Sequence, residues 1–123
     1  MKQLLLVFLG GGLGSSLRYW ISKYLNNAES TIPYGTFTVN VLGSLLIGVL
    51  LGLVLKSTFL SQNTTLLLAT GFCGGFTTFS AFAHENYLLL KSGDITSFAL
   101  YTIGSLFISI VAVFVGVWLS KFI

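Results

Sequence analysis

The stretch Gly71-Phe72-Cys73-Gly74-Gly75-Phe76-Thr77-Thr78-Phe79-Ser80-Ala81-Phe82 decides how this chain folds. It lies inside a long apolar segment, yet it contains three glycines, two threonines and a serine. Glycine weakens a helix, and hydroxyl side chains are costly in lipid. A membrane segment keeps both where an interrupted backbone lines a cavity or a buried contact. The stretch therefore predicts a broken membrane helix and the seat of function.

The whole chain has the composition of an integral membrane protein. Only 7% of its 123 residues are charged, and its mean hydropathy is +0.94. A soluble domain carries roughly a quarter charged residues. We predict an all-α membrane protein with four transmembrane helices that form a single domain, residues 1–123. Each predicted span reaches or exceeds the roughly 20 residues needed to cross the hydrocarbon core as a helix. The spans are Leu4–Leu25, Thr36–Leu55, Thr64–Leu90 and Ile95–Phe122.

The third span is expected to break near Gly74–Thr77, because two adjacent glycines there precede two threonines. A break frees backbone carbonyls, which cannot stay unsatisfied inside a membrane. Carbonyls at unwound segments are the usual ligands of a buried alkali cation. The sequence therefore allows a structural sodium site that uses no carboxylate.

The positive charges are balanced between the two sides of the membrane. Four spans place the N-terminus, the second loop (Lys56–Asn63) and the C-terminus on one side. The charges divide into Lys2, Lys56 and Lys121 against Arg18, Lys23 and Lys91. Equal numbers leave the positive-inside rule without a preference. We expect insertion in both orientations, and two opposed copies would supply the symmetry that larger transporters obtain from inverted repeats. The alternative is that a weak bias fixes one orientation in the cell.

The polar groups of the spans argue against an enzyme. The ionisable groups near membrane depth are Arg18, His84 and Glu85. They include no pair of carboxylates for acid–base catalysis, no Ser-His-Asp set and no spacing typical of metal ligands. The lone Cys73 excludes an intrachain disulfide. The net charge of +3 is too modest for a nucleic-acid-binding signature.

Hydrogen-bond donors are what the spans offer instead. Small residues four apart, such as Gly10 and Gly14, are explained by close helix packing. Packing does not explain the amide, the phenol and the hydroxyls, which need partners in a low-dielectric medium. These donors belong to Asn40, Tyr101, Thr77, Thr78, Ser80, Ser105 and Ser109. A path lined by donors suits an anion.

Three phenylalanines accompany the hydroxyls. Phe76, Phe79 and Phe82 recur every three residues, so a helix that restarts near Thr77 would place them roughly along one side. An aromatic ring is negative on its face and positive at its edge. Ring edges would contact a small anion that has shed water, whereas ring faces would favour a cation. The alternative that these rings face lipid or fill a core stays open.

With these motifs in place, the chain resembles the small bacterial fluoride channels, the Fluc or CrcB group. The resemblance covers the whole chain and rests on three motifs in order. They are Gly11-x-x-Gly14-x-x-x-Arg18-Tyr19, Gly35-Thr36-x-x-x-Asn40-x-x-Gly43 and Gly71-x-x-Gly74-Gly75-x-Thr77-Thr78-Phe79-Ser80. It implies an antiparallel dual-topology homodimer in the cytoplasmic membrane, with two fluoride pores that export fluoride passively.

The resemblance also assigns residues. A central structural sodium ion would be held by the backbone carbonyls of Gly74 and Thr77 in both subunits. The pore phenylalanines would be Phe79 and Phe82, and the pore asparagine would be Asn40. The polar track would consist of Thr78, Ser80, Tyr101, Ser105 and Ser109. Glu85 would lie near one pore end, and Arg18 would lie near a pore vestibule.

Two other functions compete with this one. A small multidrug exporter also has four spans and inserts both ways, but its proton exchange needs a carboxylate in the first span, where this chain has Arg18 and no acid. A helper protein that only packs against partners would explain the glycines. It would leave Asn40 and the hydroxyls of Thr77–Ser80 without a role.

Overall fold

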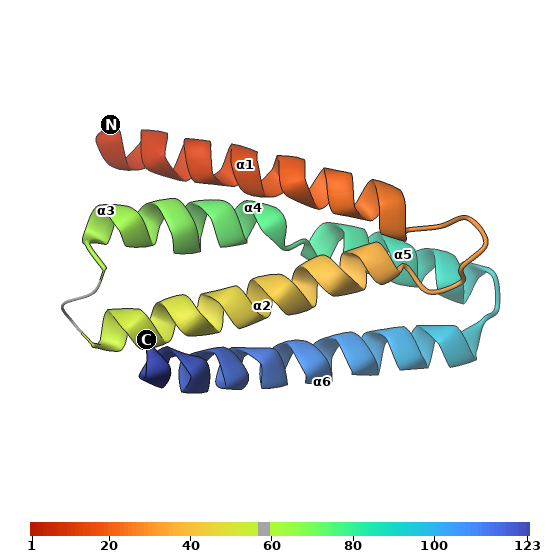
Figure 1. Ribbon diagram of the computed structural model, residues 1–123. Coiled ribbons are helices and arrows are strands. Elements are labelled where there is room, and N and C mark those ends of the chain that lie inside the picture. The colour runs from red at the N-terminus through yellow and green to blue at the C-terminus, as the bar shows by residue number, and fades with distance from the viewer. Residues whose placement is uncertain (57–59) are drawn as a thin grey trace.

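The structure is a computed structural model that describes residues 1–56 and 60–123. The described chain is helical (Figure 1), and four segments are long and apolar enough to cross a membrane. These segments are Lys2–Leu25, Tyr34–Leu55, Gln62–Lys91 and Ile95–Phe122. They agree within two residues with the predicted spans, so the prediction of four membrane helices is confirmed. The predicted second loop, Lys56–Asn63, includes residues 57–59, which lie outside the described residues.

Successive spans run in opposite directions, and both termini lie at the same end of the bundle (Figure 1). The first two spans are α1 (Lys2–Leu25) and α2 (Tyr34–Leu55). The third span comprises α3 (Gln62–Thr65), the π-helix η1 (Leu66–Cys73), α4 (Gly74–Phe76) and α5 (Phe79–Lys91). The fourth comprises α6 (Ile95–Leu119) and the 3-10 turn η2 (Ser120–Phe122).

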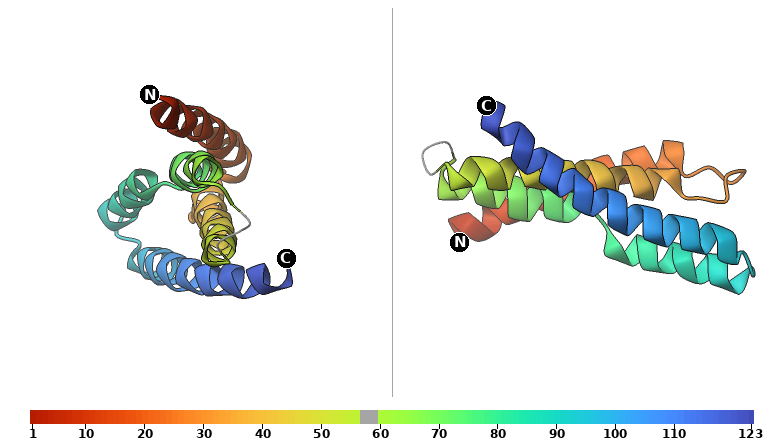
Figure 2. Two further views of the ribbon diagram at one scale, coloured as in Figure 1. Left: turned by 90° about the vertical axis from the view of Figure 1, so that its left-hand side faces the viewer. Right: turned by 90° about the horizontal axis from the view of Figure 1, so that it is seen from below.

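The two halves of the third span pack against different helices. The first half, η1 and α4, lies along α1, whereas α5 packs on α6. The end-on view in Figure 2 shows α5 displaced from the line of α1, η1 and α2. The second span, α2, lies against α6 and also contacts α1 and η1. It therefore connects the side of the bundle that holds α1 and η1 with the side that holds α5 and α6.

Between α4 and α5 the backbone leaves the helical conformation at two threonines. Thr77 has φ −84 and ψ 157, and Thr78 has φ −149 and ψ 117. Gly74, in contrast, is helical, with φ −62 and ψ −37. The hydroxyl of Thr78 accepts a hydrogen bond of 3.2 Å from the amide of Ala81 and so caps the start of α5. The threonines rather than the glycines therefore adopt the extended backbone.

Glycines serve a different purpose in the contact between α1 and the third span. A Cβ atom at Gly10 would meet the carbonyl oxygen of Leu67, and one at Gly14 would meet the carbonyl oxygen of Phe72. The backbones approach each other too closely for any side chain at these positions. The predicted role of these two glycines in helix packing is confirmed.

Replacing Gly10 with alanine is expected to lower the free energy of unfolding by about 1–3 kcal/mol, because the added methyl group overpacks this contact. Unfolding in detergent, followed by circular dichroism, measures the change. Gly12→Ala is the matched control, since no atom of the described residues lies within 4 Å of its added methyl group beyond its own helix. Equal midpoints for both variants would contradict the close approach.

The turn between α5 and α6 is set by local chemistry. Gly93 ends α5 with a positive φ of 81, a backbone conformation that glycine adopts without strain. Asp94 then begins α6, because its carboxylate accepts a hydrogen bond of 3.0 Å from the amide of Ser97. This hydrogen bond holds the pKa of the half-buried Asp94 carboxyl below its ordinary value. The short turn keeps α5 and α6 side by side.

Candidate functional site

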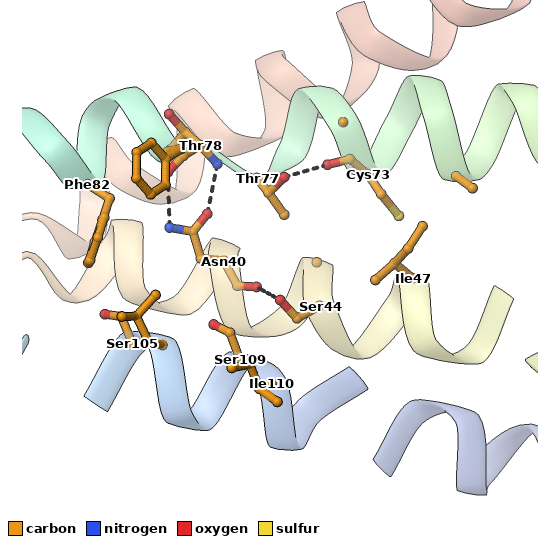
Figure 3. Close-up of a pocket in the computed structure, with 15 residues that line it drawn as sticks. Asn40, Ser44, Ile47, Cys73, Thr77, Thr78, Phe82, Ser105, Ser109 and Ile110 are labelled. Atoms are coloured by element: carbon orange, nitrogen blue, oxygen red, sulfur yellow. Dashed lines mark hydrogen bonds between the residues drawn. The ribbon is translucent and has the colours of Figure 1, made fainter. Parts of the chain in front are cut away.

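A groove of about 470 Å³ lies where α2, the two halves of the third span and α6 face one another (Figure 3). Its lining is mostly apolar, and its hydrogen-bonding side chains come from α2, from the extended residues Thr77 and Thr78, and from α6. Most of the residues predicted for the pore and for sodium line it. They are Asn40, Gly74, Thr77, Thr78, Phe79, Phe82, Ser105 and Ser109. The groove therefore brings together side chains that are up to 69 positions apart in the sequence.

Asn40 holds the extended backbone between α4 and α5 at both ends of its amide. Its Oδ1 accepts a hydrogen bond of 2.7 Å from the amide of Thr78, and its Nδ2 donates one of 3.1 Å to the carbonyl of the same residue (Figure 3). An asparagine amide has two N–H donors, so one N–H remains for another acceptor. Asn40 thus fixes the shape of the groove as well as contributing to its wall.

Arg18 and Ser15 contact the carbonyl group that the end of α4 leaves without a helical partner. In a continuous helix the carbonyl of Gly75 would accept from the amide four residues later. Here it accepts from Nε of Arg18 at 2.9 Å and from the hydroxyl of Ser15 at 3.3 Å. A cation near a helix C-terminus is favourable. Arg18 does not line the groove but secures the end of α4 from the side of α1.

Replacing Arg18 with alanine is expected to lower the free energy of unfolding by about 1–3 kcal/mol, since a charged donor to a half-buried carbonyl is lost. Thermal unfolding of the purified protein in detergent measures the loss. Lys23→Ala removes the same charge from an exposed position of α1 and is expected to have a smaller effect. Equal losses from the two substitutions would show that Arg18 acts through its charge alone.

The aromatic rings at the groove differ in exposure. Phe82 is buried, whereas Phe79 is 76% exposed, and the two ring centroids lie 5.7 Å apart at an angle of 47°. The ring of Tyr101 lies 5.2 Å from that of Phe82. Phe76 precedes the extended residues and stacks on Phe72 at 5.5 Å. The sequence predicts the three rings along one side of a helix that restarts near Thr77, but extended backbone at Thr77 and Thr78 separates Phe76 from the helix that carries Phe79 and Phe82.

Two serines of α6 line the groove opposite Asn40 (Figure 3). Ser105 is only 5% exposed, and its hydroxyl is the buried side-chain group for which the described residues provide no hydrogen-bond partner. Leaving a buried hydroxyl without a partner costs about 1–3 kcal/mol. Such a group in a groove is suited to a ligand that accepts hydrogen bonds.

The remaining predicted residues lie beside the groove rather than along it. Ser80 is exposed, and its hydroxyl lies 3.3 Å from that of Thr78. The phenol of Tyr101 donates to Oε2 of Glu85 at 3.0 Å, and the hydroxyl of Thr36 donates to Oε1 at 2.6 Å. Glu85 itself lines a second hollow of about 500 Å³, beside the loop between α1 and α2. The carboxylate is thus held between two helices behind Phe82.

The comparison with known proteins identifies the family of the chain. Residues 5–117 match the family described as "CrcB-like protein, Camphor Resistance (CrcB)". The chain belongs to the CrcB-like family. The resemblance drawn from its three motifs is confirmed.

Curated relatives are similar to this chain along nearly their whole length. A protein of Phocaeicola vulgatus is 48% identical over 122 residues, which are 98% of this chain and 100% of the relative. One of Gloeothece citriformis is 49% identical over 123 residues, 98% of each chain. One of Flavobacterium psychrophilum is 43% identical over 122 residues, 98% of each chain. All three are named "Fluoride-specific ion channel FluC". With its four apolar spans, this CrcB-like chain is a multi-pass membrane protein.

The sequence did not single out Asn26, and Thr36 stood out only as the start of the second span and as part of the second motif of the resemblance. In this CrcB-like chain the side chain of Asn26 contacts the backbone of Gly35 and Thr36 and the hydroxyl of Thr36. The available signal was an asparagine at the end of one span and a proline just before the next. That signal indicates a loop, but it does not say which helix end the asparagine will cap.

Proposed function

We propose that this chain is a fluoride-specific ion channel through which fluoride leaves the cell passively across the cytoplasmic membrane. The observation that carries the proposal is the full-length similarity to CrcB-like relatives that bear this name. Fluoride is small and tightly hydrated, so a pore for it must replace lost water with closely spaced donors.

The chemistry of the groove supports an anion path. Hydroxyl donors of Ser105, Ser109 and Thr78 occupy a largely apolar wall, and the ring of Phe82 lies next to them. No carboxylate lines the groove among the described residues. Donors and ring edges together attract a dehydrated anion, while an apolar wall excludes competing water. We therefore propose that fluoride moves along this groove, past Phe82 and Ser105.

Exposure of the groove supports a pore completed by a second copy. Two residues of its lining, Phe79 and Leu106, are 76% and 52% exposed. Gly74 also lines it, and no atom of the described residues lies within 4 Å of a Cβ built there beyond its own helix. Packing within one copy of the chain therefore does not require a glycine at position 74, and the absence of a side chain there leaves room for the close approach of a second copy. We propose an antiparallel homodimer with two pores, which the balanced loop charges allow.

A structural sodium ion at the centre of that dimer is part of the proposal. In a continuous helix the carbonyls of Gly74 and Thr77 would accept from residues 78 and 81. Here the amide of Thr78 donates to Asn40, and that of Ala81 donates to the Thr78 hydroxyl. Both carbonyls are therefore released beside the groove and fit the ligand type of an alkali cation. When bound, the ion would supply positive charge that offsets repulsion between anions in two nearby pores.

The same observations argue against the alternative function, a proton-coupled multidrug exporter. Exchange of protons for a cationic drug needs a carboxylate in the first span, and Lys2–Leu25 contains neither aspartate nor glutamate. Arg18 in that span repels a cation and is committed to the carbonyl of Gly75.

Fluoride release from proteoliposomes separates the two functions. The vesicles are loaded with potassium fluoride, and a potassium ionophore balances the charge that leaves. We expect release down the fluoride gradient at a rate that an imposed pH gradient leaves unchanged when external pH is buffered well above the pKa of hydrofluoric acid. Release that requires the proton gradient would contradict a channel and favour the exporter.

A further inference from the structure

Asn26 ties the end of α1 to the start of α2. It is the residue after the last turn of α1, and its side chain crosses the loop. Its Oδ1 accepts hydrogen bonds from the amides of Gly35 at 2.7 Å and Thr36 at 3.2 Å. Amides in the first turn of a helix have no partner within the helix, so this oxygen caps α2. A Cβ at Gly35 would lie 2.7 Å from the same oxygen, which leaves room only for glycine.

The nitrogen of the same side chain sets the direction of a buried hydroxyl. Nδ2 of Asn26 donates to Oγ1 of Thr36 at 3.2 Å. A hydroxyl has one proton, so Thr36 accepts from Asn26 and donates its own proton to Oε1 of Glu85 at 2.6 Å. Thr36 is 1% exposed, so bulk water offers the hydroxyl no alternative partner. Hydrogen bonds therefore run in one direction from Asn26 to Glu85.

The far end of this chain of hydrogen bonds reaches the aromatic wall of the groove. Glu85 accepts its second hydrogen bond from Tyr101, which is 2% exposed. The ring of Tyr101 packs on Phe82, whose own ring lines the groove. The position of the carboxylate is thus coupled to the ring that we propose fluoride must pass.

We infer that Asn26 is a positioning residue for fluoride conduction, which acts by orienting the Thr36 hydroxyl and thereby holding the Glu85 carboxylate behind Phe82. The inference rests on the proposed function. If the hydroxyl turned toward residue 26, one oxygen of Glu85 would lose its donor inside the protein. The Glu85 carboxylate would then accept hydrogen bonds from the hydroxyls of the groove instead. There it would compete with fluoride for donors, and its negative charge would repel the fluoride ion.

Asn26→Asp separates this role from capping. The aspartate keeps an oxygen for the amides of Gly35 and Thr36, and a carboxylate at a helix N-terminus is favourable. It cannot donate, so it accepts the proton of Thr36 and reverses the hydrogen bond. We expect fluoride release from proteoliposomes to fall about tenfold, the effect of removing one donor from a charged group. The thermal midpoint is expected to stay near that of the unaltered protein, because the stronger cap of α2 offsets the donor that Glu85 loses.

Asn27→Asp is the matched control. It adds the same charge one residue further along the same hollow, and the Oδ1 of Asn27 contacts only the amide of Glu29, at 3.1 Å, among the described residues. We expect near-normal release from it. A loss equal to that of Asn26→Asp would assign the effect to charge alone and overturn the inference.

A double substitution tests the pathway through the hydroxyl. Thr36→Val removes the hydroxyl at nearly constant volume, so adding Asn26→Asp to it should cause no further loss if both act through this group. Independent losses that add would overturn the inference, as would full release from Asn26→Asp alone. Absence of release from the unaltered protein would instead overturn the proposed function, and the inference with it.

Discussion

A variant whose loop lysines favour one orientation is expected to release no fluoride when it is the only chain expressed. Gln62→Lys combined with Asn63→Lys adds two positive charges to the side of the membrane that carries the termini. These residues are exposed at the start of α3, so the change acts on insertion rather than on packing. The positive-inside rule would then drive every copy into one orientation. Without opposed copies the proposed antiparallel pair cannot form, and fluoride release from proteoliposomes should be abolished.

Co-expression provides the control for this variant. Ala28→Lys combined with Glu29→Lys adds lysines to the exposed loop on the opposite side and should give an equally inactive chain. The two variants together should recover release, because each supplies the orientation that the other lacks. Full activity from either strongly biased variant alone would contradict an obligatory antiparallel pair.

Phe82→Ile is expected to lower fluoride release by about tenfold, taking about 1.4 kcal/mol for the electrostatic contact of an anion with a ring edge. Isoleucine keeps much of the volume of the buried ring, so the loss would come from the electropositive ring edge rather than from a cavity. Phe79→Ile should act in the same direction, since that ring lies 5.7 Å from Phe82 and lines the same groove. Release rates from proteoliposomes at equal protein density measure both.

Phe8→Ile is the matched control for these rings. Phe8 is 73% exposed on α1 and lines neither hollow, so its replacement should leave release unchanged. Size-exclusion profiles of all three variants check that assembly is intact. Normal release from both Phe79→Ile and Phe82→Ile would contradict a contact between these rings and fluoride, and would show that the rings serve only packing.

Length and hydropathy were sufficient to predict the four spans. A membrane helix must satisfy its backbone internally, so a continuous apolar run has one structural outcome. The close approach of α1 to the third span was likewise readable from Gly10 and Gly14, because small residues four apart have a direct geometric meaning.

The side-chain contacts between different spans could not be predicted from the sequence in this way. Asn40 was expected as a donor for the anion, yet it binds the backbone of Thr78 at two points. Arg18 was placed near a vestibule by resemblance, yet it contacts the carbonyl of Gly75. Both partners lie at least 38 positions away in the chain, and periodicity along one helix says nothing about which turn of another helix it will meet. The roles of both residues in conduction remain predictions.

Gly74 and Gly75 show that a pair of adjacent glycines can serve helix packing rather than a change of backbone direction. Their presence predicted that the helix would be interrupted by glycine flexibility, whereas both lie within α4. A Cβ at Gly75 would meet the carbonyl oxygen of Gly11, so this glycine allows α1 to approach. The extended backbone belongs to Thr77 and Thr78, and hydrogen bonds from Asn40 and to the amide of Ala81 stabilise it.

Selective release of fluoride is the most direct test of the proposed channel. Purified protein is reconstituted into vesicles that contain equal concentrations of fluoride and chloride, and two ion-selective electrodes follow both ions after dilution. A groove that offers closely spaced donors to a small dehydrated anion predicts rapid loss of fluoride while chloride stays inside. Release of both ions at equal rates would contradict a fluoride-specific channel.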